Sequence, residues 1–262
     1  MLFARKTMKI SIIRTVQEAF TMCSIPLFKP VNLVFDIDDT MYDLMEPFKK
    51  AHEKFFAGRV SMDSTELFQK SRVYSDIILA QEKEGKIRRE DSFHERLRMT
   101  YRDAGLEITR EESGRFETEY RFRQTVITMF DFMKDVLDYC KEEGIPIAAL
   151  TNGNHEGQWR KVEALNLQRW FLPEQIFISG DIGYHKPDVH AFMAVGESMD
   201  FLPEHTWYIG DTYESDIAGA SQAGWRTLWL NHRKRPCPDA ASAADKELTS
   251  GDELLMFIRS LL

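Results

Sequence analysis

Three carboxylates occur within four positions of the sequence, at Asp36, Asp38 and Asp39. They follow the apolar run 31–35, whose pattern is typical of a strand buried on both faces of a parallel sheet. Like charges at the end of a buried strand destabilise one another, because solvation there is poor. A hard divalent cation such as Mg²⁺, which takes oxygen ligands, relieves that repulsion. The alternative is an acidic turn that caps the next helix.

Polar side chains also follow two later apolar runs. One run ends at Thr151 and Asn152, another ends at Asp211, and Lys186 lies between them in the chain. In an open parallel sheet the carboxyl ends of the strands meet at one edge, where ligands bind. A hydroxyl, a lysine and several carboxylates at that edge indicate a phosphoryl-transfer site, in which a cation, the lysine and the hydroxyl neutralise phosphate oxygens.

The elements that must position these residues alternate between strand and helix in the second half of the chain. Strands are expected at 145–150, 176–179, 206–209 and 226–230, and helices at 155–165, 189–199, 217–223 and 251–262. This alternation is typical of an α/β fold with a doubly wound parallel sheet. Two segments between these elements, 203–206 and 237–245, are expected to be loops.

Residues 47 to about 132 differ, because their apolar residues recur at helical spacing and no strand is predicted there. We therefore expect an N-terminal extension at 1–30, an α/β core formed by 31–46 and 126–262, and an inserted all-helical domain at 47–125. The first 29 residues lack the pattern of a signal peptide, and an amphipathic appendage and an over-called start codon both stay open.

The composition argues against several classes of function. With 262 residues the chain can bury a sizeable core. A net charge of -8 and the lack of a basic stripe argue against a nucleic acid polymer as partner. The basic runs 86–89 and 232–235 are expected to be solvated surface. No apolar run is long enough to span a membrane. The odd, widely spaced Cys23, Cys140 and Cys237 favour a reducing cytoplasm over a disulfide framework.

Taken in order, four segments resemble the motifs of the haloacid dehalogenase (HAD) superfamily, in its phosphatase branch. They are DxDxT at 36–40, Thr151 in the segment 150–153, Lys186 in the segment 184–188, and GDxxxxD at 210–216. The resemblance covers about residue 32 to the C-terminus. It implies a Rossmann-like core, and the helical insertion stands where one large subgroup of the superfamily carries an α-helical cap.

The resemblance implies a role for each motif residue. Asp36 is the expected nucleophile and forms an aspartyl-phosphate. Asp38 is the expected general acid and then base, a role for which its pKa should be raised. Thr151 and the backbone N–H of Asn152 are expected to bind phosphoryl oxygens, and Lys186 to offset the negative charge.

The same resemblance implies a Mg²⁺ site. The carboxylates of Asp36 and Asp211 and the backbone carbonyl of Asp38 are its expected ligands. Asp216 is expected to orient the ion's water ligands or to add a further carboxylate, and Tyr42 is expected to face the substrate. Other acidic residues near the motifs are expected to be solvated or helix-capping, namely Asp39, Asp43, Asp181 and Glu214.

Asp38 favours phosphate esters as substrates, since dehalogenases attack carbon and do not need an acid two residues after the nucleophile. The resemblance thus implies a Mg²⁺-dependent phosphatase of a small phosphorylated metabolite, with nucleoside monophosphates and sugar or glycolate phosphates as candidates. A phosphomutase of the β-phosphoglucomutase kind is the alternative enzyme. A non-catalytic binding scaffold is a third interpretation, against which the intact motif residues argue. The sequence does not indicate an oligomeric state.

Overall fold

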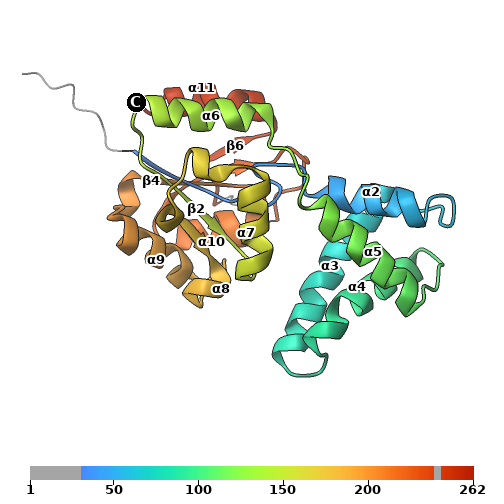
Figure 1. Cartoon of the computed structure of the whole chain (residues 1–262). Coiled ribbons are helices and arrows are strands. Elements are labelled where there is room, and N and C mark those ends of the chain that lie inside the picture. Colours follow the sequence, from blue (N-terminus) through green and yellow to red (C-terminus); the bar gives the residue numbers. More distant parts are fainter. Residues whose placement is uncertain (1–30, 239–242) are drawn as a thin grey trace, which may run out of the picture.

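The computed structural model describes residues 31–238 and 243–262 (Figure 1). Within them, parallel strands form one sheet in the order β3-β2-β1-β4-β5-β6. The strands are β1 (Asn32–Phe35), β2 (Ile147–Thr151), β3 (Ile176–Ile178), β4 (Thr206–Gly210), β5 (Arg226–Leu230) and β6 (Lys246–Leu248). The doubly wound α/β fold predicted from the sequence is confirmed. The extension 1–30 lies outside the described residues.

Side chains of β1 alternate between two buried faces of the sheet. Leu33 and Phe35 pack in a cluster with side chains of α6 (Asp131–Glu142) and α11 (Leu254–Arg259). Val34 packs on the opposite face with side chains of α9 (Val189–Met199) and α10 (Ala218–Gln222). Figure 1 shows these two helix pairs on opposite sides of the sheet. Since both faces are covered, β1 reads as a continuous apolar run.

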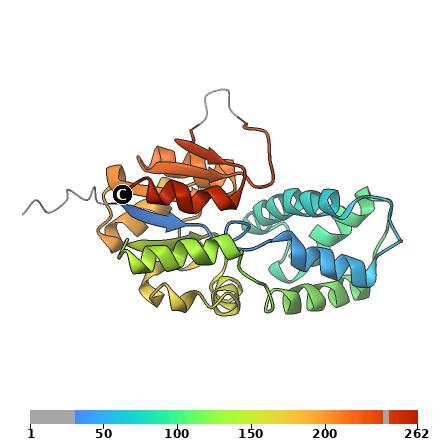
Figure 2. The same cartoon turned by 90° about the horizontal axis from the view of Figure 1, so that it is seen from above.

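The inserted helices form a group of their own beside the sheet, as Figures 1 and 2 show from two directions. They are α2 (Met45–Phe55), α3 (Ser64–Lys83), α4 (Arg89–Asp103) and α5 (Arg110–Arg123). Their shared core is aromatic: the ring of Phe48 lies 5.7 Å from that of Phe68 and 5.4 Å from that of Phe116. The exact domain boundaries at 47 and 125 stay a prediction.

Two elements of the core differ from the expectation. Helix α6 begins at Asp131 and packs against α11 in the α/β core. The end of the helical pattern seen in the sequence, at about residue 132, therefore belongs to the core and not to the inserted helices. Strand β6 was not predicted, because Lys246 and Glu247 are exposed and only Leu248 is buried, which leaves no alternating pattern. No helix in 31–238 or 243–262 combines the length and the apolar character needed to cross a bilayer.

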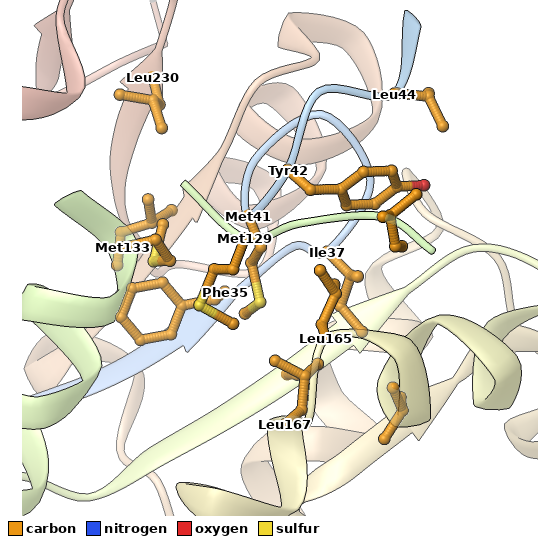
Figure 3. Close-up of a cluster of buried hydrophobic side chains, with 14 of the residues drawn as sticks. Phe35, Ile37, Met41, Tyr42, Leu44, Met129, Met133, Leu165, Leu167 and Leu230 are labelled. Carbon is orange, nitrogen blue, oxygen red and sulfur yellow. The ribbon is translucent and has the colours of Figure 1, made fainter. Parts of the chain in front are cut away.

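A buried apolar cluster supports the loop that follows β1 (Figure 3). Ile37 and Met41 of this loop are fully buried and meet Met129, which lies on the segment that returns from the inserted helices. The polar residues between them therefore turn away from the cluster, toward the carboxyl edge of the sheet. The burial of Ile37 and Met41 fixes the orientation of this loop.

The start of the C-terminal helix offers a test of this packing. Gly251 lies against the ring of Phe132 so closely that an added Cβ would overlap it. We expect Gly251→Ala to destabilise the protein by about 1–3 kcal/mol through this overpacking. Gly114→Ala is the control, because nothing lies within 4 Å of a Cβ there, and a gain of about 0.5–1 kcal/mol is expected in the helix. Urea unfolding measures both, and equal stabilities for the two variants would contradict the packing.

Candidate active site

Asp36 is the first residue after β1 and is buried at the centre of the carboxyl edge. Its backbone N–H donates to the carbonyl of Ile209 at 2.9 Å, which extends the pairing of β1 with β4 by one residue. One carboxylate oxygen accepts from Lys186 Nζ at 2.7 Å, and the other accepts from Thr40 Oγ1 at 3.3 Å. The side chain is thus held in place by contacts from its own loop and from a distant one.

Lys186 is the central cation of the site. Its Nζ donates to Asp36 Oδ1, Asp216 Oδ1 and the hydroxyl of Tyr208, each at 2.7 Å. Burial would lower the pKa of Lys186, but the charges of Asp216 and Asp36 raise it well above its usual value, so the ammonium form is kept. Asn152 fixes the lysine backbone, accepting from its N–H and donating to its carbonyl, both at 2.9 Å.

Three buried carboxylates meet beside Lys186. Asp36, Asp211 and Asp216 each offer an oxygen within 4.8 Å of the other two. Burial, followed by the charges of Asp216 and Asp38, raises the pKa of Asp36 to about 7, although Lys186 opposes the shift. Burial and the charges of neighbouring carboxylates likewise raise the pKa of Asp211 well above its usual value. The site therefore holds more negative charge than its lysine neutralises.

A glycine allows these carboxylates to approach one another. A Cβ at Gly210 would lie 2.5 Å from Asp216 Oδ2, so no other residue fits between β4 and that side chain. The same oxygen of Asp216 accepts the backbone N–H of Thr212 at 3.0 Å. The spacing GDxxxxD thus returns the second aspartate to the end of β4 beside the first.

Asp38 has a cation of its own. Lys161 on α7 (His155–Ala164) donates Nζ to both of its carboxylate oxygens, at 2.7 and 2.6 Å. The hydroxyl of Tyr42 donates to Oδ1 at 2.7 Å, and Gln158 Nε2 donates to Oδ2 at 3.2 Å. Burial alone would raise the pKa of Asp38, but Lys161 and these hydrogen bonds hold it below its usual value. The expectation of a raised pKa is therefore wrong in this conformation.

Two residues expected to contact the substrate make contacts inside the protein. Tyr42 is 1% exposed and its hydroxyl donates to Asp38, so the contact that the structure gives it orients the carboxylate of Asp38. Thr151 is fully buried, and its Oγ1 donates to Gln158 Oε1 at 3.2 Å. Phosphate binding by Thr151 and Asn152, and a substrate contact by Tyr42, stay predictions.

Asp39 is buried, 2% exposed, and lies in the left-handed region with a φ of 62°. Arg233 binds both of its oxygens at 2.5 Å, and Arg235 approaches at 3.3 Å. The expectation of a solvated Asp39 is wrong. Asp39 accepts the N–H of Leu44 at 3.2 Å, but α2 has no side-chain cap, so the capping role is not observed either. The prediction that the basic run 232–235 is solvated surface is also wrong for Arg233, because its side chain pairs with the buried Asp39.

Sequence reasoning missed several residues that complete the site. Lys161 and Gln158 contact Asp38, and Arg235 contacts Asp211. Tyr208 accepts a hydrogen bond from Lys186, and Arg233 binds Asp39. Arg235 Nη1 lies 3.2 Å from Asp211 Oδ2. One signal was present in the sequence: a basic run that directly follows a strand of a parallel sheet lies at the same edge as the carboxylates. The fold and this constellation of carboxylates and buried lysines define an α/β enzyme.

Comparison with known proteins gives the family. A family model described as haloacid dehalogenase-like hydrolase matches residues 32–224. Since this is more than half of the chain, the protein belongs to the haloacid dehalogenase-like hydrolases. It is 26% identical to the HAD-hydrolase YfnB of Bacillus subtilis over 207 residues, which cover 78% of this chain and 86% of YfnB.

Shorter matches link the chain to phosphatases. A glyceraldehyde 3-phosphate phosphatase of Methanopyrus kandleri is 30% identical over 124 residues, 46% of this chain and 52% of the relative. A phosphoserine phosphatase of Thermus thermophilus is 31% identical over 122 residues, 47% of each chain. The match spans about half the length of each of these two phosphatases.

Solved structures agree on the fold. The crystal structure of YfnB bound to magnesium has a TM-score of 0.66 at 24% identity and covers 87% of this chain and 98% of that one. The L-2-haloacid dehalogenase RSc1362 has a TM-score of 0.70 at 19% identity, with 87% and 98% covered. At these identities the similarity establishes the fold alone.

The ion pair between Arg233 and Asp39 can be tested by stability. Arg233→Met leaves Asp39 buried without its main partner, so we expect a loss of about 3–5 kcal/mol in unfolding free energy. The double variant with Asp39→Asn should recover part of it. Arg226→Met is the control, since its pair with Asp245 is exposed and should change stability by about 1 kcal/mol or less. Equal effects of Arg233→Met and Arg226→Met would refute a structural role for the pair.

Proposed function

We propose that this protein is a cytoplasmic, Mg²⁺-dependent phosphatase that hydrolyses a small phosphorylated metabolite through an aspartyl-phosphate. The observation that carries the proposal is the pair of carboxylates at the end of the central strand, the buried Asp36 and the half-buried Asp38, each held by its own lysine. Nucleoside monophosphates and sugar or glycolate phosphates are the candidate substrates. The phosphatase names of several relatives support an ester of phosphate over a halogenated acid.

The three carboxylates beside Lys186 fit a hard divalent cation. Asp36, Asp211 and Asp216 supply only oxygen ligands, which is what Mg²⁺ prefers. The raised pKa values of Asp36 and Asp211 support a further positive charge there. Asp36 and Asp211, with the backbone carbonyl of Asp38, are the proposed ligands. When bound, Mg²⁺ would neutralise phosphate oxygens and help to orient the phosphoryl group.

The lysine directs the nucleophile. In the first step an oxygen of Asp36 attacks phosphorus, the bond from phosphorus to the ester oxygen breaks, and the leaving alcohol takes a proton. The contact between Lys186 and Asp36 Oδ1 fixes the carboxylate plane. Because Lys186 also binds Asp216, it stays protonated at the site and neutralises charge that develops on the phosphoryl group.

Asp38 is the proposed group that moves the proton. It gives a proton to the leaving alcohol in the first step, and in the second it takes a proton from the water that attacks the aspartyl-phosphate. Lys161 favours the ionised form of Asp38, which is the form needed for the second step. In the first step Asp38 must be protonated, although Lys161 favours its ionised form. The negative charge of the bound substrate offsets this effect of Lys161.

The proposal is tested by phosphate release from a panel of phosphorylated metabolites, with Mg²⁺ and with a chelator. We expect release to need the metal and to fall to background in Asp36→Asn, because the amide cannot act as the nucleophile. Asp131→Asn is the matched control, since Asp131 is a fully solvated carboxylate at the start of α6. Circular dichroism verifies that each variant is folded.

The other interpretations give different results in the same assay. A phosphomutase would convert a sugar phosphate into its isomer with little free phosphate. A binding scaffold would release none while remaining folded. Metal-dependent release that survives in Asp36→Asn would refute the proposed nucleophile.

A second prediction concerns Lys161. We expect Lys161→Met to slow hydrolysis of an alkyl phosphate by roughly tenfold to a hundredfold, because Asp38 loses its main partner and general acid–base catalysis is weakened. Hydrolysis of p-nitrophenyl phosphate should fall less, since its leaving group needs no protonation. Lys134→Met, which removes an exposed lysine, should change neither rate. Equal losses for the two esters would show that Lys161 does not act through proton transfer.

A further inference from the structure

Asp211 is the most loosely held of the three carboxylates beside Lys186. Lys186 pairs with the other two at 2.7 Å but forms no ion pair with Asp211. Within the part of the chain that the structure describes, the carboxylate of Asp211 meets only two donors, Thr212 Oγ1 and Arg235 Nη1, both at 3.2 Å. Charge-assisted N–H···O contacts are usually about 2.7–2.9 Å long, so Asp211 keeps much of its charge uncompensated.

Arg235 is placed at this carboxylate by a fixed backbone. The side chain of Asn231, the residue after β5, accepts the N–H of Arg235 and donates to its carbonyl, both at 2.8 Å. Asn231 is buried and also donates to Glu247 Oε1 on β6 at 2.8 Å. Asn152 binds the backbone of Lys186 in the same two-way manner. The fold thus fixes the backbones of two cations at the carboxyl edge by the same kind of contact.

The two cations differ in how firmly their side chains are held. Lys186 is buried and makes three contacts at 2.7 Å, so moving its ammonium would leave buried charges unpaired. The side chain of Arg235 is 40% exposed, and its contacts are longer, at 3.2 Å to Asp211 and 3.3 Å to Asp39. Asp39 needs no second cation, because Arg233 already binds both of its oxygens. Arg235 can therefore return to solvent, provided that another cation takes its place at Asp211.

A divalent cation can replace Arg235 at Asp211. Asp36, Asp211 and Asp216 each offer an oxygen within 4.8 Å of the other two, at the proposed Mg²⁺ site. Arg235 and the ion would share the carboxylate of Asp211, and two cations on one carboxylate repel each other, so each weakens binding of the other. A partner that only oriented Asp211 would instead strengthen metal binding. The long contact and the exposed side chain of Arg235 favour competition over orientation.

We propose that Arg235 is an exchangeable counter-cation for Asp211, which it neutralises in the metal-free protein and releases when the divalent cation binds. This inference rests on the Mg²⁺ site of the proposed function and concerns the affinity of that site. Arg235 lowers the affinity for the ion, because its contact with Asp211 must be given up as the ion binds. In return, the metal-free protein is spared a buried carboxylate without a cation.

Binding of Mg²⁺ alone tests the inference. Isothermal titration calorimetry compares the wild type with Arg235→Gln, which removes the charge, and with Arg235→Lys, which keeps it. Lys234→Gln is the matched control, because it removes one positive charge from the neighbouring position, where the side chain is exposed and forms no ion pair within residues 31–238 and 243–262. Asp211→Asn identifies the heat of binding that arises from this site.

We expect Arg235→Gln to bind Mg²⁺ roughly 5- to 30-fold more tightly than the wild type, because one positive charge no longer opposes the ion. Arg235→Lys should keep nearly the wild-type affinity, Lys234→Gln should change it by about twofold or less because its charge is screened by solvent, and Asp211→Asn should abolish binding. Weaker or unchanged binding in Arg235→Gln would overturn the inference. So would binding that persists in Asp211→Asn, or that is absent from both the wild type and Arg235→Gln.

Thermal unfolding gives a second readout that needs no turnover. In a chelator, Arg235→Gln should unfold at a lower temperature than the wild type, because Asp211 is left buried without a cation. Added Mg²⁺ should raise the unfolding temperature more for Arg235→Gln than for the wild type, since tighter binding stabilises the folded state more. An equal rise for the two proteins would count against the exchange.

These measurements fail independently of the proposed function. Tighter binding of Mg²⁺ by Arg235→Gln, without phosphate release from any ester, would support the exchange and contradict the phosphatase function. Metal-dependent phosphate release, with equal Mg²⁺ affinities for the wild type and Arg235→Gln, would support the phosphatase function and contradict the exchange.

Discussion

The buried contact of Lys186 with Asp36 and Asp216 determines how the rest of the site is arranged. Removing three charges from water is unfavourable unless each finds a close partner, and here one ammonium serves two carboxylates at 2.7 Å. The strand order makes this possible, because β1 and β4 are neighbours and bring Asp36 beside the segment that carries Asp216. Asn152, from the end of β2, then fixes the lysine backbone from the other side.

The other two carboxylates of the loop after β1, Asp38 and Asp39, each pair with a different cation. Asp38 pairs with Lys161 from α7, and its neighbour Asp39 pairs with Arg233 from the loop after β5. Adjacent residues thus direct their charges to opposite flanks of β1. Repulsion within the loop is lowered without removing any acid, and only the carboxylates beside Lys186 keep an excess of negative charge. The place where a further cation is most favourable is therefore beside Lys186 and Asp36, which is the phosphate site of the proposed function.

Much of this could be predicted because the motif residues sit at strand ends, and the fold gathers strand ends at one edge. Asp36 and Asp211 follow from that rule, whereas Lys186, which lies beyond α8 (Ser179–Ile182), was identified by its motif. Lys161 and Arg233 did not follow, because each lies on an element whose rotation and loop path decide the contact, and neither leaves a periodic pattern in the sequence. The same limit explains the pKa of Asp38, which depends on a lysine 123 residues away.

The linkers of the inserted helices are joined to the catalytic loop by backbone pairing. Tyr42 forms one bridge with Asp38 and another with Met129, and the N–H of Phe130 donates to the carbonyl of Met41 at 2.9 Å. The two segments that enter and leave the insertion are thus paired with each other beside Asp38. A movement of the inserted helices relative to the sheet would therefore change the orientation of the Asp38 carboxylate.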